Sequence, residues 1–99
     1  MRGVTIVVAS AEPARLDAAL TLANAVAALG GRARVYLHDA AVTAAMPRDP
    51  YAAAVELGVT FVACQTALDV HGIPLPAGWE GGGMVGLVAD LDDDRLVVA

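Results

Sequence analysis

Short apolar strands alternate with helical patterns along this chain, and this alternation limits the folds open to it more than any other feature. Residues 4–9, VTIVVA, form an apolar run after Gly3, which is typical of a strand buried on both faces. Residues 13–29 follow with Leu and Ala at helical spacing, opened by Pro13 and closed by the glycine pair 30–31. A strand followed by a crossover helix predicts a parallel sheet with helices on both faces.

The alternation continues to the last residue. A short helix over residues 40–45 is expected to end before Pro47, and Asp49 and Pro50 are expected to open a helix over residues 51–57. The remaining predicted elements are strands at residues 33–37, 59–63 and 95–99 and helices at residues 65–71 and 84–91.

The length allows one hydrophobic core and no second one, because a chain of 99 residues is near the common size of a single domain. We therefore expect one α/β domain over residues 1–99. The expected architecture is a flavodoxin-like three-layer α/β/α arrangement around a small parallel sheet. The expected strand order is 2-1-3-4, with strands numbered along the chain.

Composition narrows the range of partners. The chain has six arginines, no lysine and a formal net charge of −5, which argues against binding to nucleic acid or to anionic membranes. The apolar run near the N-terminus is too short for a signal peptide or a membrane span. A lone cysteine forms no internal disulfide, so we expect a cytoplasmic protein with a free thiol.

Candidate functional residues follow from the expected sheet, because ligands of parallel α/β sheets bind beyond the carboxyl ends of the strands, near the reversal of strand order. The residues directly after the first three predicted strands are Ser10 and Ala11, His38 and Asp39, and Cys64 and Gln65. We expect Ser10, His38 and Gln65 to line a pocket beside Cys64, although a serine in this position is also typical of a helix cap.

Cys64 is the candidate catalytic residue. It is expected between a strand and a helix N-terminus, where free N–H groups and the helix dipole favour a nucleophilic thiolate. The alternative is a small buried apolar residue. His38 is either a proton donor to Cys64 or a loop histidine, and the expected order, with strand 1 between strands 2 and 3, favours the loop histidine. His71 is expected to interact with the C-terminal carbonyls of its helix.

Other features have structural and functional interpretations. Residues 74–83, rich in Gly and Pro, are expected to be irregular, and glycines 81–83 lack the spacing of a nucleotide-binding loop, so no cofactor is expected. Trp79 and Tyr51 are either subunit contacts or packing residues. A cluster of acids suggests either a hard-cation site or, as the spacing favours, solvated side chains at a helix end: Asp90, Asp92, Asp93 and Asp94.

Several segments resemble the DsrE/DsrF/TusD-like proteins, the DsrE family of small sulfur-relay domains. The segment that carries most of this likeness is residues 62–73, VACQTALDVHGI. Shorter pieces in the same order are residues 6–10, 27–30, 35–37 and 87–98. The resemblance implies assembly into trimers or hexamers and, in sulfur-carrier members, a persulfide on the cysteine that matches Cys64. Known carriers place basic residues before the helix-ending glycine, whereas this chain has Asp69, Val70 and His71.

Three hypotheses follow. The first is a sulfur carrier or sulfurtransferase that holds a persulfide on Cys64 and exchanges it with donor and acceptor proteins. The second is a non-catalytic homo-oligomeric module with a structural cysteine, which binds a small ligand or protein near the strand edge and residues 74–83. The third, a flavin-binding domain, rests on the flavodoxin-like topology alone. A small apolar chain is also expected to bury surface against copies of itself.

Overall fold

The computed structural model describes residues 1–45 and 49–99. Strands and helices alternate as the sequence predicts, with ends that differ by a residue or two, and Pro47 lies outside the described residues. In chain order the elements are β1 (Val4–Val8), α1 (Pro13–Ala28), β2 (Ala33–Leu37), the 3-10 helix η1 (Asp39–Ala44), α2 (Asp49–Glu56), β3 (Thr60–Cys64), α3 (Gln65–His71), β4 (Glu80–Gly82), α4 (Met84–Ala89) and β5 (Arg95–Val98).

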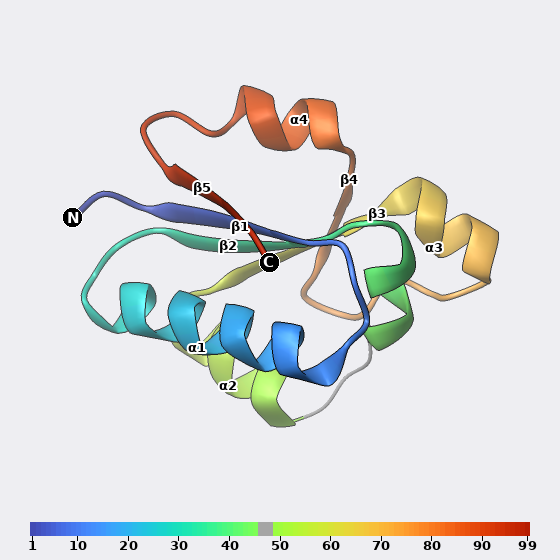
Figure 1. The fold of residues 1–99 in the computed structure, drawn as a ribbon, viewed down its shortest axis with the longest axis horizontal. Coiled ribbons are helices and arrows are strands. Elements are labelled where there is room, and N and C mark those ends of the chain that lie inside the picture. Colours follow the sequence, from blue (N-terminus) through green and yellow to red (C-terminus); the bar gives the residue numbers. More distant parts are fainter. Residues whose placement is uncertain (46–48) are drawn as a thin grey trace.

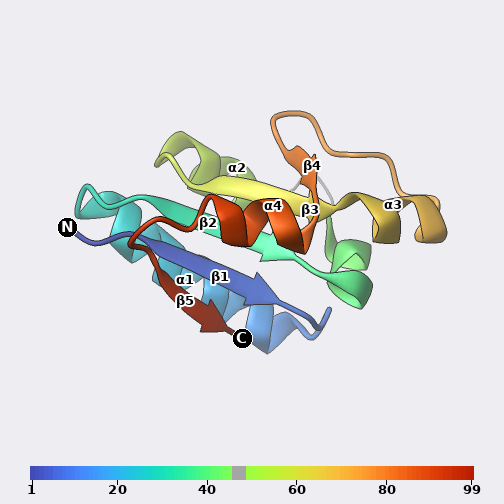
Figure 2. The ribbon, with the colours of Figure 1, turned by 90° about the horizontal axis from the view of Figure 1, so that it is seen from above.

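The strands form one parallel sheet, and the flavodoxin-like three-layer α/β/α class is confirmed (Figure 1). Helices α1 and α2 cover one face of the sheet, and α4 lies over the other (Figures 1 and 2). None of the described helices is long and apolar enough to cross a bilayer.

The expected strand order 2-1-3-4 is wrong, because the sheet runs β4-β3-β2-β1-β5. The first two crossovers, through α1 and α2, lie on the same face, and right-handed crossovers on one face carry successive strands in one direction. The order reverses only when the chain passes over the opposite face through α4 and places β5 beside β1. The reversal therefore lies between β1 and β5, away from Cys64.

The segment at residues 74–83 is less irregular than expected. Residues Glu80–Gly82 form β4, an edge strand paired with β3, in which Gly82 lies beside Cys64. Trp79, just before this strand, is 9% exposed and stacks on Phe61 with 4.9 Å between ring centroids. Tyr51 meets both rings edge-on. Trp79 and Tyr51 are therefore packing residues of the main core.

The two faces of the sheet have cores of different size. The larger core lies on the face covered by α1 and α2. The smaller core, on the α4 face, contains Val7, Tyr36, Val62 and Leu87, with Cys64 packed against it. Tyr36 pairs with Val62, and Cys64 lies two residues after Val62 on β3. Because side chains alternate along a strand, all three point to the same face of the sheet.

One acid of the 90–94 cluster is buried. Asp94 is 6% exposed and accepts hydrogen bonds from the Thr5 hydroxyl, at 3.0 Å, and from Arg32, at 2.9 Å. The guanidinium of Arg34 lies 3.8 Å from the same carboxylate oxygen. The solvated-acid interpretation is thus wrong for Asp94, because Arg32 and Arg34 provide buried or partly buried partners. Within the described residues, no group of three or more His, Cys, Asp or Glu side chains could hold a metal ion.

Candidate functional site

Cys64 lies at the junction that the sequence predicts. It is the last residue of β3 and the N-cap of α3, which ends at Gly72 in the left-handed conformation. The thiol is free and partly exposed, and it packs at the margin of both cores. The candidate nucleophile is therefore held on a strand end, where it pairs with Gly82 of β4 and directly follows Ala63, which pairs with Leu37 of β2.

Four donors converge on the sulfur of Cys64. Partial burial raises the pKa of this thiol, but four nearby donors lower it by a larger amount: the N–H of Ala67, the Tyr36 hydroxyl and the N–H groups of Asp39 and Thr66. The net result is a pKa below that of an ordinary cysteine. Two of the backbone donors belong to the first turn of α3, and the third opens η1.

Asp39 contributes its N–H through an uncommon backbone conformation. Its φ is 50°, in the left-handed region that Asp tolerates better than most residues. The chain turns here from the end of β2 into η1, beside the end of β3. The site therefore draws donors from two consecutive β-α connections, as expected for the carboxyl edge of a parallel sheet.

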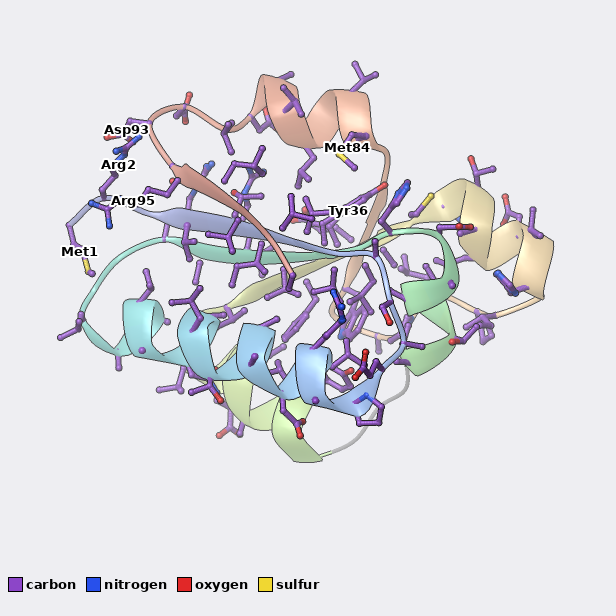
Figure 3. All side chains as sticks on the ribbon, viewed as in Figure 1. Met1, Arg2, Tyr36, Met84, Asp93 and Arg95 are labelled. Atoms are coloured by element: carbon purple, nitrogen blue, oxygen red, sulfur yellow. The ribbon has the colours of Figure 1, made fainter. Side chains whose placement is uncertain are left out.

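Tyr36 is the donor that the sequence does not single out. It is 1% exposed, under α4 on the strand next to Cys64 (Figure 3). Burial raises the pKa of the Tyr36 hydroxyl, and its hydrogen bond to Cys64 and the charge of the thiolate raise it further. The hydroxyl therefore keeps its proton and remains a donor. Only the strand order reveals this pair, because it makes β2 and β3 neighbours.

His38 lies closer to Cys64 than the expected strand order allowed. Leu37 pairs with Ala63, so His38 and Cys64 are the next residues on adjacent strands. The His38 ring stacks on Tyr36 with centroids 6.0 Å apart. Its Nδ1 atom is buried and has no hydrogen-bond partner among the described residues. The expected order places strand 1 between His38 and Cys64, and this is the reason that it favours a distant loop histidine. In the observed order, β2 and β3 are neighbours and no strand separates the two residues.

Of the other two residues expected in the pocket, Gln65 lies beside Cys64 and Ser10 does not. Ser10 lies after β1, two strands from β3, and its hydroxyl accepts the N–H of Glu12 at 3.1 Å before α1. It is therefore a local turn residue and does not join Cys64. Gln65 is exposed, lies against Gly81 of β4, and donates to Asp69 at 3.1 Å. The structure thus places His38 and Gln65, but not Ser10, on elements next to Cys64.

The neighbourhood of Cys64 is acidic and apolar. Exposed acids stand on three adjoining elements: Asp39 on η1, Asp69 on α3 and Glu80 on β4. Arg2 and Arg95 lie at the end of the sheet where β1 and β5 begin, away from Tyr36 (Figure 3). The remaining described arginines are paired with carboxylates: Arg15 with Glu12, and Arg32 and Arg34 with Asp94.

Among the described residues, two hollows lie beside elements that adjoin Cys64. A polar one of about 180 Å³ lies between α4 and β4 and is lined by Arg34, Glu80, Asp90 and several glycines. An apolar one of about 450 Å³ lies between the end of η1 and the segment after α3, lined by Thr43, Ala45, Ile73, Pro74, Leu75, Pro76 and Ala77.

The comparisons with protein families and with curated proteins give no relative from which a role could be transferred. No protein-family model matches the chain, and no curated protein matches it. The functional assignment therefore depends on the chemistry around Cys64.

Proposed function

We propose that this chain is a DsrE-like sulfur carrier that holds a persulfide on Cys64 for transfer between proteins. The observation that carries the proposal is the position of one free, partly exposed sulfur at the start of α3, against the small core that holds Tyr36, with hydrogen-bond donors beside it that lower its pKa. A structural cysteine needs no such donors, because a neutral thiol is a weak acceptor. Donors aimed at a sulfur favour its anionic form, which is the nucleophile in sulfur exchange.

The proposed reaction has two displacement steps. In loading, the Cys64 thiolate attacks the outer sulfur of a donor persulfide, R–S–SH, and the donor leaves as the thiolate R–S⁻. This step yields Cys64–S–SH. In unloading, an acceptor thiolate A–S⁻ attacks that outer sulfur, A–S–SH forms, and Cys64 leaves as a thiolate. Each step breaks one S–S bond and forms another, so no oxidant or reductant is needed.

The charges around Cys64 bear on the choice of partner. Because the exposed acids Asp39, Asp69 and Glu80 lie on the elements next to Cys64, a small sulfur anion would approach against a negative potential. A protein or peptide with basic residues beside its own cysteine would be attracted. The proposed donors and acceptors are therefore thiol proteins with basic surfaces, in a reducing cytoplasm that keeps the thiols free.

We also propose self-association into trimers or hexamers, as the resemblance implies. Apolar side chains stand exposed on the α4 face of the molecule, among them Val85, at 86%, and Val98, at 70%. Burial of such residues against a second copy would remove apolar surface from water. Light scattering at micromolar concentration would test this, and a monomeric mass would contradict it.

The alternative is a non-catalytic binding module, and the apolar hollow beside residues 73–77 favours it. In that case Cys64 is dispensable. The test is intact mass spectrometry of wild type and Cys64→Ser after incubation with a low-molecular-weight persulfide. Reductant-reversible gain of one sulfur by wild type alone supports the carrier. Absence of the adduct, with Cys64 also inert to a thiol probe in the folded protein, would favour the binding module.

A further inference from the structure

We propose that Tyr36 is a positioning residue of the transfer site, whose hydroxyl stabilises Cys64 as the leaving group and so favours the release of sulfur to the acceptor. This inference rests on the proposed carrier function of Cys64. It assigns a role to a buried side chain that carries no sequence motif.

The surroundings of Tyr36 show that its hydroxyl has a specific partner. The ring packs in the small core with Val7, Val62 and Leu87, all apolar. Phenylalanine would fill this space without a polar group to desolvate, because a buried hydroxyl costs free energy unless it is hydrogen-bonded. Cys64 packs against the same small core from the adjacent strand, two residues beyond the partner of Tyr36, and its sulfur is the acceptor for this hydroxyl.

Tyr36 is also held rigidly. It lies in the middle of the sheet, on a strand paired on both sides, with Val7 and Val62 beside it in register. The ring of His38 stacks on it at an interplanar angle of 25°. A donor fixed in this way needs no reorganisation when charge develops on the sulfur, which is the condition for effective electrostatic stabilisation.

The two displacement steps place opposite demands on the Cys64 thiolate. In loading it is the attacking group, and a less basic thiolate is intrinsically a weaker nucleophile. In unloading it is the leaving group, and a less basic thiolate leaves faster. A hydrogen bond from Tyr36 therefore speeds unloading and slightly lowers the intrinsic rate of loading. It shifts the balance of the two steps toward transfer of sulfur to the acceptor.

The variant Tyr36→Phe tests this by removing the hydroxyl alone. Loss of one hydrogen bond to a charged sulfur should move the midpoint of Cys64 alkylation by iodoacetamide upward by about one pH unit. At a pH above both midpoints, the equilibrium constant for unloading to a thiol acceptor should fall about tenfold, while the loading rate stays level or rises. Thr21→Ala is the control, because it removes the hydroxyl of an exposed side chain on α1, whose hydrogen bond to the carbonyl of Asp17 does not involve the site.

A packing role would give a different result. If Tyr36 only fills space, Tyr36→Phe should leave the alkylation midpoint unchanged, and that outcome would overturn the proposal. A shifted midpoint in a protein that takes up no sulfur would refute the carrier function but not the coupling of Tyr36 to Cys64. Should Tyr36→Phe fail to fold, the wild type labelled with 3-fluorotyrosine serves instead. Its Tyr36 fluorine resonance should titrate with the Cys64 midpoint, and a resonance unaffected by Cys64→Ser would contradict the proposal.

Discussion

Replacement of Asp94 by asparagine should destabilise the fold far more than the same change at its exposed neighbour Asp93. The Asp94 carboxylate is buried and accepts from Thr5 and Arg32, with Arg34 close by. Asp94→Asn keeps the shape of the side chain but removes its charge. The two guanidinium groups are then left without their shared counter-ion.

The expected loss follows from how exposed these partners are. The side chain of Arg32 is 43% exposed and can be solvated again, whereas that of Arg34 is 10% exposed and cannot. Removal of one partner of a fully buried pair costs about 3–5 kcal/mol, and a hydrogen bond to a charged group contributes about 1.5–3 kcal/mol. With one buried and one exposed arginine, we expect Asp94→Asn to lower the free energy of unfolding by about 2–3 kcal/mol.

Urea unfolding followed by the fluorescence of Trp79 measures this change, because this single tryptophan is buried in the main core. The corresponding fall in Tm is roughly 8–24 °C for a domain of this size. Asp93→Asn should stay within about 0.5 kcal/mol of wild type, as surface changes usually do. Equal stability of Asp94→Asn and Asp93→Asn would refute the role assigned to the buried carboxylate.

Three further outcomes are expected. Gly3→Ala should lower the free energy of unfolding in urea by about 1–3 kcal/mol, because its Cβ would meet the Asp94 carboxylate. Gly86→Ala, which has open space around it, should raise that free energy by about 0.5–1 kcal/mol. Equal effects of the two substitutions would contradict this. Because folding lowers the pKa of Cys64, the unfolding free energy of wild type relative to Cys64→Ser should rise as pH increases from the folded-state to the unfolded-state pKa, and a pH-independent difference would exclude this linkage. At low salt, cationic cystamine should react with Cys64 faster than an anionic disulfide does, and Asp69→Asn should reduce the ratio of these two rates. A faster reaction with the anionic disulfide would contradict the proposed effect of the acids around Cys64.

The strands and helices of this fold could be predicted from local patterns, but their order in the sheet could not. The order depends on which face each crossover helix covers, and the short apolar helices α2 and α4 carry no local signal for that choice. Strand β4 escapes prediction because Glu80, Gly81 and Gly82 include no β-branched or aromatic residue. It forms because β3 would otherwise be the edge of the sheet, with backbone groups free to pair with it.

The candidate site could be predicted only where it depends on chain position. Cys64 follows a strand and opens a helix, and both are visible in sequence. Tyr36 and His38 join the site only because β2 lies next to β3, which the expected order excluded. Asp94 is indistinguishable in sequence from the acids beside it, since its burial depends on arginines on and before β2.

Transfer of sulfur through Cys64 tests the proposed carrier function most directly. The protein is loaded from a persulfide donor, freed of that donor and mixed with a peptide whose single cysteine is flanked by arginines. Intact mass spectrometry then follows both species. The proposed function predicts that the protein loses one sulfur for each sulfur that the peptide gains, and that Cys64→Ser transfers none. Sulfur that stays on the protein, or that Cys64→Ser transfers equally well, would contradict it.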